Sequence, residues 1–286
     1  MAIATPARVD VTTARRQALL KRLASAVVLL PVFLLIVVKA PGWMFNVLVV
    51  VASAAALWEL MRLFEHGGRP AYARLGVIAG TLVTASFGAS RLLDPLMLPA
   101  LALALAVGAV LSAPLWQAIP ATEPAANTLL AILYVGWMLG HGILLHHTSP
   151  IGDELVLFLV GVTWIGETSA YVVGSAIGRL KLAPVISPKK TVEGAAAQVV
   201  ASVISGAALG AWLLPQCGAG VAVAAGALIG IVGQVCDLAE SVIKRSVGRK
   251  DTGGIIPGHG GVLDRIDSLL FNLPAFYYFT LATGCR

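Results

Sequence analysis

Residues 258–284 read GHGGVLDRIDSLLFNLPAFYYFTLATG, a glycine-rich polar stretch followed at once by an apolar run. Only 12% of all residues are charged, yet His259, Asp264, Arg265 and Asp267 gather at the start of this run. The apolar part indicates the kind of fold, because a run of this length suits a membrane-spanning helix. The polar part indicates where chemistry takes place.

The rest of the chain has the same apolar character. Apolar residues make up 58% of the 286, and the mean hydropathy is +0.88, so lipid is the solvent for most of the sequence. Spans of roughly 20 residues cross a hydrocarbon core of ~30 Å. Nine runs have about this length: 23–39, 43–61, 74–90, 93–117, 125–147, 154–178, 195–215, 219–243 and 262–284.

These runs are continuous instead of alternating, which excludes a β-barrel and leaves helices, whose backbone polar groups are satisfied internally. The predicted fold class is therefore all-α: a polytopic integral membrane helical bundle of about nine spans. We divide it into a basic cytoplasmic segment (1–22), an N-terminal region of five spans (23–153) and a C-terminal catalytic region of four (154–286).

The basic residues predict the orientation, because Lys and Arg accumulate on cytoplasmic flanks. With nine spans and a cytoplasmic N-terminus, every basic residue except Lys39, Arg91 and Arg286 falls on the cytoplasmic side. The net charge of +6 then suits anionic headgroups and phosphate-bearing substrates, and needs no nucleic acid.

Small residues give two structural predictions. The pairs Gly206/Gly210 and Gly226/Gly230 have GxxxG spacing, which indicates close helix packing. The three cysteines have neither metal-ligand nor redox spacing, so we interpret them as isolated packing residues: Cys217, Cys236 and Cys285.

Buried charge is scarce in the first five spans and concentrates in three later clusters, all on the predicted cytoplasmic side. The first is Glu167 within WIGETSAY, where a carboxylate inside a span costs at least ~2.5 kcal/mol and is usually paired, hydrated or functional. The second is the loop GRLKLAPVISPKKTVEG. Its Ser187-Pro188 pair predicts a helix opening, and free amides there, beside Lys189 and Lys190, would cradle phosphate.

The third cluster, DLAESVIKRSVGRKDTGGIIPGHGGVLDRID, begins at Asp237 and ends with Asp264 and Asp267 at the start of the last span. Carboxylates from two helices at one polar mouth, with Lys and Arg around them, fit Mg²⁺ holding a nucleoside triphosphate. We predict that Asp237 and Asp264 share this ion.

These clusters resemble a known family. The stretch Ser241 to Asp267, SVIKRSVGRKDTGGIIPGHGGVLDRID, resembles the signature of the phosphatidate cytidylyltransferase (CDP-diacylglycerol synthase) family. SPKKTVEG (187–194), and Ala170-Tyr171 followed by Gly174, resemble further family motifs in the same order. One residue departs from the pattern: Glu167 stands where the family is expected to carry aspartate.

The resemblance implies Mg²⁺-dependent transfer of the cytidylyl group of CTP to phosphatidate. Whether a second, monovalent cation is also bound stays open. The resemblance also implies a homodimer, contact with membrane lipids and a bacterial inner membrane. We assign catalysis to Asp237, Asp264, Lys250 and Arg265, and metal binding to Asp237, Asp264 and Glu167. We assign substrate binding to Ser187, Lys189, Lys190, Thr191, Ser241, Lys244, Arg245, Asp251, His259, Gly260, Gly261 and Asp267.

Two alternatives stay open at this point. One is a related transferase that acts on another lipid phosphate, such as an ether lipid. The other is a secondary transporter of an anionic solute, which would also bury charge but at the membrane midplane between repeated halves.

Overall fold

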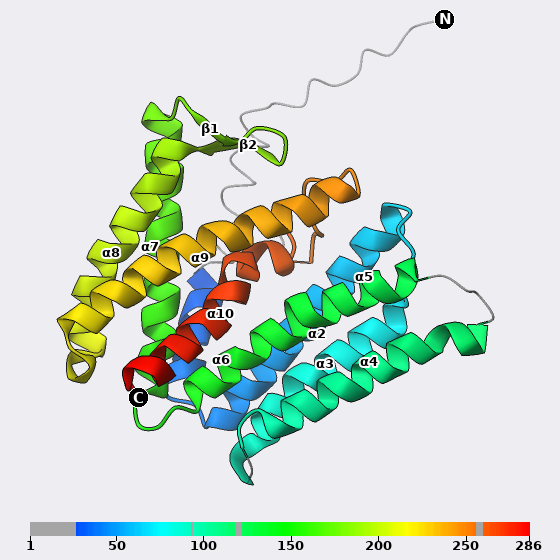
Figure 1. Cartoon of the computed structure of the whole chain (residues 1–286). Coiled ribbons are helices and arrows are strands. Elements are labelled where there is room, and N and C mark those ends of the chain that lie inside the picture. The colour runs from blue at the N-terminus through cyan, green and yellow to red at the C-terminus, as the bar shows by residue number, and fades with distance from the viewer. Residues whose placement is uncertain (1–26, 93, 118–121, 256–259) are drawn as a thin grey trace, which may run out of the picture.

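The apolar runs form long helices in a computed structural model that describes residues 27–92, 94–117, 122–255 and 260–286 (Figure 1). Within these ranges, six helices are long and apolar enough to cross a membrane: Gly42–His66, Met97–Leu115, Glu123–His146, Gly152–Ile177, Val192–Leu213 and Ala219–Ser246. Two shorter apolar helices are Val27–Val38 and Ala73–Ala89. The polytopic helical membrane fold is thus confirmed, and the expected count of nine spans is approximate. The segment predicted at residues 1–22 lies outside the described residues.

The N-terminal half is a group of packed helices. Its elements are α2 (Gly42–His66), α3 (Ala73–Ser86), the 3₁₀ turn η1 (Phe87–Leu92), α4 (Met97–Gln117), α5 (Glu123–Ala131), the π-helical turn η2 (Ile132–Trp137) and α6 (Met138–His146). Buried hydroxyls link three of them: Thr84 Oγ1 lies 2.7 Å from Ser53 Oγ and donates to the Gly136 carbonyl oxygen at 2.9 Å. These bonds satisfy polar groups that lipid could not.

The C-terminal half contains α7 (Gly152–Ile177), α8 (Val192–Leu213), the 3₁₀ turn η3 (Pro215–Cys217), α9 (Ala219–Ser246) and α10 (Leu263–Thr283). The glycine pairs allow α8 and α9 to pack closely, as predicted. A Cβ atom placed on Gly206 would lie 2.8 Å from Gly226 Cα, and one on Gly226 would lie 2.3 Å from the Ser202 carbonyl oxygen. Any larger residue at these positions would push the helices apart.

A short hairpin interrupts the helices between α7 and α8. Strand β1 (Lys181–Ala183) pairs antiparallel with β2 (Ser187–Thr191), so the predicted helix opening at Ser187-Pro188 was wrong. Pro188 is tolerated there because a two-stranded sheet consists of edges only. Helix α8 begins instead at Val192, where the Thr191 hydroxyl accepts a hydrogen bond from the Gly194 amide at 3.2 Å.

Cys217 and Cys285 form a disulfide, with their Cα atoms 5.0 Å apart. The interpretation of all three cysteines as isolated was therefore wrong for this pair, while Cys236 is free and buried. The bond joins the α8–α9 turn to the end of the chain that follows α10. Two residues 68 positions apart carry no local signal of pairing.

Candidate active site

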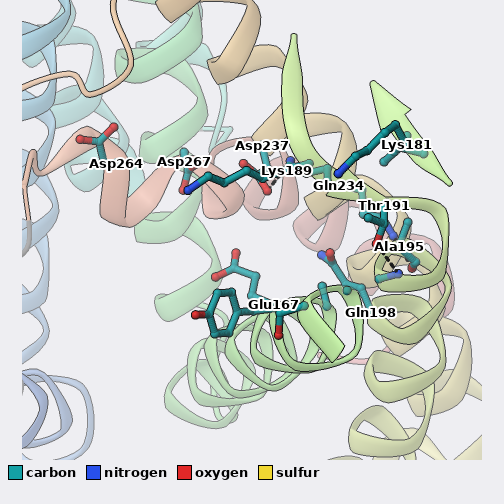
Figure 2. Close-up of a pocket in the computed structure, with 17 residues that line it drawn as sticks. Glu167, Lys181, Lys189, Thr191, Ala195, Gln198, Gln234, Asp237, Asp264 and Asp267 are labelled. Atoms are coloured by element: carbon teal, nitrogen blue, oxygen red, sulfur yellow. Dashed lines mark hydrogen bonds and ion pairs between the residues drawn. The ribbon is translucent and has the colours of Figure 1, made fainter. Parts of the chain in front are cut away.

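One end of the C-terminal half encloses a cavity of about 550 Å³ (Figure 2). The C-terminal half of α7, the β hairpin, the first turns of α8 and α10 and the second half of α9 all contribute to its lining. Four helices and the hairpin therefore bring residues from far apart in the sequence to one mouth of the bundle.

Three acidic side chains, here called the acidic cluster, face one another across this cavity: Glu167 of α7, Asp237 of α9 and Asp267 of α10. Figure 2 shows the Glu167 carboxylate directed from α7 toward Asp237 and Asp267. The charges of Glu167 and Asp237 both act on Asp267. Like charges this close repel one another, so the cluster is prepared for a cation.

Three lysines of the hairpin, here called the basic face, also line the cavity: Lys181, Lys189 and Lys190. The Lys190 ammonium group forms an ion pair with Asp237. The hairpin is held in place by Arg245 of α9, whose Nε donates to the Ile186 carbonyl oxygen at 3.1 Å. The arrangement offers positive charge to phosphates directly beside the carboxylates.

Asp264 has a different role from the acidic cluster. Its carboxylate accepts hydrogen bonds from the amides of Thr252, at 3.2 Å, and Gly261, at 3.1 Å, and Lys244 Nζ lies 3.0 Å away. Lys244 also pairs with Glu240, a side chain that is only 1% exposed. Asp264 thus organises the described parts of the segment between α9 and α10 (residues 247–255 and 260–262, here called the α9–α10 loop), and Asp267 is the carboxylate that approaches Asp237.

The cavity gathers part of the predicted site. The predicted residues that line it are Glu167, Lys189, Lys190, Thr191, Asp237, Asp264 and Asp267. Those that do not line it are Ser187, Ser241, Lys244, Arg245, Lys250, Asp251, Gly260, Gly261 and Arg265. His259 lies outside the described residues.

The sequence analysis missed several residues that the structure makes candidates for the site. Lys181 completes the basic face, and two amides, Gln198 and Gln234, line the cavity, where Gln234 Nε2 donates to the Ala195 carbonyl oxygen at 2.6 Å. The expectation of little buried charge in the first five spans also overlooked Glu59 of α2, which is 3% exposed. The signal was present: a carboxylate inside an apolar run is itself a functional indication.

The donor chemistry of the cavity fits the expected Mg²⁺, which prefers oxygen ligands. The acidic cluster offers carboxylates from three helices, and in the part of the chain that the structure describes neither Glu167 nor Asp267 forms an ion pair. Over the same residues, no three His, Cys, Asp or Glu side chains already form a metal-ligand group. Ligation would therefore require these carboxylates to move closer together around the ion.

The sequence matches the model of a family described as the cytidylyltransferase family over residues 20–283. It is 41% identical over 156 residues to the phosphatidate cytidylyltransferase of Brucella abortus (biovar 1), which covers 54% of this chain and 56% of that protein. The corresponding enzyme of Synechocystis is 44% identical over 133 residues, 46% of this chain and 45% of that protein.

A further relative is an uncharacterized protein of Escherichia coli, YnbB, with 42% identity over 153 residues, 53% of this chain and 50% of that protein. The chain thus spans about half the length of the curated relatives that it matches.

Proposed function

This chain belongs to the cytidylyltransferase family, and from that premise we propose that it transfers the cytidylyl group of CTP to phosphatidate, giving CDP-diacylglycerol and pyrophosphate. The observation that carries the proposal is the juxtaposition, in one cavity at one end of a membrane bundle, of the acidic cluster and the basic face. Two phosphate-bearing substrates, one of them a lipid, need this combination of charge and membrane contact.

The reaction needs no side-chain nucleophile. A phosphate oxygen of phosphatidate attacks the α-phosphorus of CTP in line, a new P–O bond forms, and the bond to pyrophosphate breaks. The lysines of the basic face bind and orient the phosphate oxygens, and Lys190 exchanges its contact with Asp237 for one with substrate. Catalysis is then mostly positioning and charge neutralisation.

Mg²⁺ would be held by Asp237 and Asp267, with Glu167 beside them, and when bound it would neutralise charge on the triphosphate. In this arrangement Asp264 contributes by fixing the α9–α10 loop. We further propose that the protein lies in a bacterial inner membrane with the cavity on the cytoplasmic side, where CTP is available.

Two observations support this orientation. The disulfide Cys217–Cys285 lies at the far ends of α8 and α10 from the residues that line the cavity (Figure 1), and disulfides persist in oxidising compartments. The cavity end also carries the basic residues of the hairpin and of the α9–α10 loop, as expected for a cytoplasmic face.

The activity is tested with purified protein in detergent, given radiolabelled CTP, phosphatidate and Mg²⁺. We expect a lipid-linked cytidylyl product together with one equivalent of pyrophosphate. Repeating the assay with an ether-linked phosphatidate separates the two lipid substrates. Absence of any lipid product, with solute uptake in proteoliposomes, would favour a transporter instead.

The orientation is tested with a membrane-impermeant thiol reagent on intact cells and on inverted vesicles. Val185, at the hairpin turn, is 90% exposed, and a Val185→Cys variant should react only in inverted vesicles. Cys217 and Cys285, once reduced, should react only in cells made permeable in their outer membrane. The opposite pattern would reverse the proposed orientation.

A further inference from the structure

A carboxylate of the N-terminal half reaches the α9–α10 loop. Glu59, in the C-terminal half of α2, accepts a hydrogen bond at Oε2 from the Leu263 amide at 2.9 Å, across 204 residues of sequence. Leu263 is the first residue of α10, and amides in the first turn of a helix have no partner within the helix. Glu59 therefore caps α10 from another helix, with a charge that suits the positive end of the helix dipole.

The backbone of the loop packs directly on this carboxylate. A Cβ atom placed on Gly253 would lie 2.6 Å from Glu59 Oε1, and one on Gly261 would lie 2.7 Å from Glu59 Oε2. Only glycine allows so close an approach at both positions. Two parts of the loop thus pack against the same carboxylate.

The residues that contact Glu59 are adjacent to those that hold Asp264. Asp264 accepts hydrogen bonds from the amides of Gly261 and of Thr252, which is the neighbour of Gly253. Glu59 and Asp264 therefore both hold the loop, and both carboxylates lie close to Gly261. Because Asp267 follows Asp264 by one helical turn of α10, the same contacts also help to set the position of Asp267 in the acidic cluster.

Glu59 has no structural need for its charge in α2. The side chain is buried, Oε1 lacks a hydrogen-bond partner, and over the ranges that the structure describes it forms no ion pair. A buried, unpaired carboxylate in a membrane helix is costly, and a leucine would pack there at lower cost. Within the described residues, the contacts with the loop and with Leu263 are the interactions that stabilise this carboxylate.

We propose that Glu59 is a positioning residue for the transfer reaction: it fixes the α9–α10 loop and the start of α10, and so places Asp264 and Asp267 at the cavity. The inference rests on the proposed function, since it concerns the same site. It extends the site to α2, outside the segments whose motifs indicated it.

The test compares Glu59→Met, which removes the acceptor, with Glu59→Gln, which keeps an acceptor oxygen for the Leu263 amide. Ser53→Ala is the matched control, because Ser53 is also buried in α2 but bonds to Thr84, away from the loop. Hydrogen exchange of the amides at 248–255 and 260–264, which needs no activity, is measured beside kcat, the KM for CTP and thermal melting.

We expect Glu59→Met to speed exchange in these amides and to lower kcat by about 10²-fold, the loss typical of misplaced catalytic groups, with a smaller change in KM. Glu59→Gln should restore kcat to within a few-fold of wild type. Ser53→Ala should lower the melting temperature and leave loop exchange and kcat unchanged.

The inference would be overturned if the loop amides of Glu59→Met exchanged at the wild-type rate. It would also be overturned if Ser53→Ala lowered kcat as much as Glu59→Met does. Equal loss in Glu59→Gln and Glu59→Met would overturn the hydrogen bond as its basis. If the wild-type protein forms no product, the proposed function fails, but the exchange data still decide whether Glu59 holds the loop.

Discussion

Lys190 of β2 pairs with Asp237 of α9, so that one cation of the hairpin is held by one carboxylate of the acidic cluster. The pair links the two kinds of charge that the cavity offers. Neither partner is fully buried, with side-chain exposures of 24% and 36%, so each can exchange its partner for a ligand. In the proposed reaction the pair opens when CTP and its cation bind.

Replacing Lys190 tests this exchange. In Lys190→Met the triphosphate loses a charge-assisted contact, so the KM for CTP should rise by about 10-fold or more. Arg179→Met is the control, because Arg179 is exposed near the hairpin but does not line the cavity. Steady-state kinetics with varied CTP measure the effect, and equal KM values in both variants would exclude Lys190 from substrate binding.

Substitutions of Glu167 test whether its carboxylate, one methylene longer than that of the expected aspartate, contributes to the reaction. Glu167→Gln should lower turnover by about 10²-fold or more, the size of a lost preorganised charge contact, whereas Glu167→Asp should keep most of it. Glu154→Gln, in the first turn of the same helix and away from the cavity, should match wild type. Full turnover in Glu167→Gln would show that this carboxylate is structural.

Asp237 and Asp267 should act as a unit if they hold one ion. Asp237→Asn and Asp267→Asn should each lower turnover by about 10³-fold and raise the Mg²⁺ concentration for half-maximal activity, and the double variant should be little worse. A Mg²⁺ titration for the three variants measures this. Fully multiplicative losses with unchanged Mg²⁺ dependence would mean that the two aspartates do not share an ion.

Asp264→Asn tests whether Asp264 holds the α9–α10 loop or binds the metal ion. Since Asp264 binds loop amides and Lys244, its loss should disorder the α9–α10 loop and lower the melting temperature, with turnover reduced as a consequence. Thermal melting and hydrogen exchange of the loop measure this. If Asp264→Asn changed only the Mg²⁺ dependence, the sequence-based pairing of Asp237 with Asp264 would be restored.

Gly226 tests the close packing of α8 on α9. Gly226→Val should destabilise the protein by about 1–3 kcal/mol, because the new Cβ meets the Ser202 carbonyl oxygen and overpacks the interface. Gly220→Ala, in the same helix, has open space around it and should melt like wild type. Thermal melts in detergent compare the two, and equal melting temperatures would contradict close packing at Gly226.

The sequence by itself determined the kind of fold, the approximate spans and much of the candidate site. Lipid as solvent explains this success, because each span must be apolar along its own length and so carries a local signal. The GxxxG pairs also carried a local signal, because their four-residue spacing places both glycines on one face of a helix. Charge is scarce in these apolar runs, so the three clusters that contain Glu167, Lys190, Asp237 and Asp267 were visible before their positions were known.

Only the tertiary structure decided which of these groups meet. It formed a strand where Ser187-Pro188 predicted a helix, joined Cys217 to Cys285, and made Asp267 instead of Asp264 the neighbour of Asp237. It also brought Glu59 to Leu263. Each of these outcomes depends on how separate helices pack, and a contact between residues tens or hundreds of positions apart leaves no periodicity or spacing in the sequence from which it could be predicted.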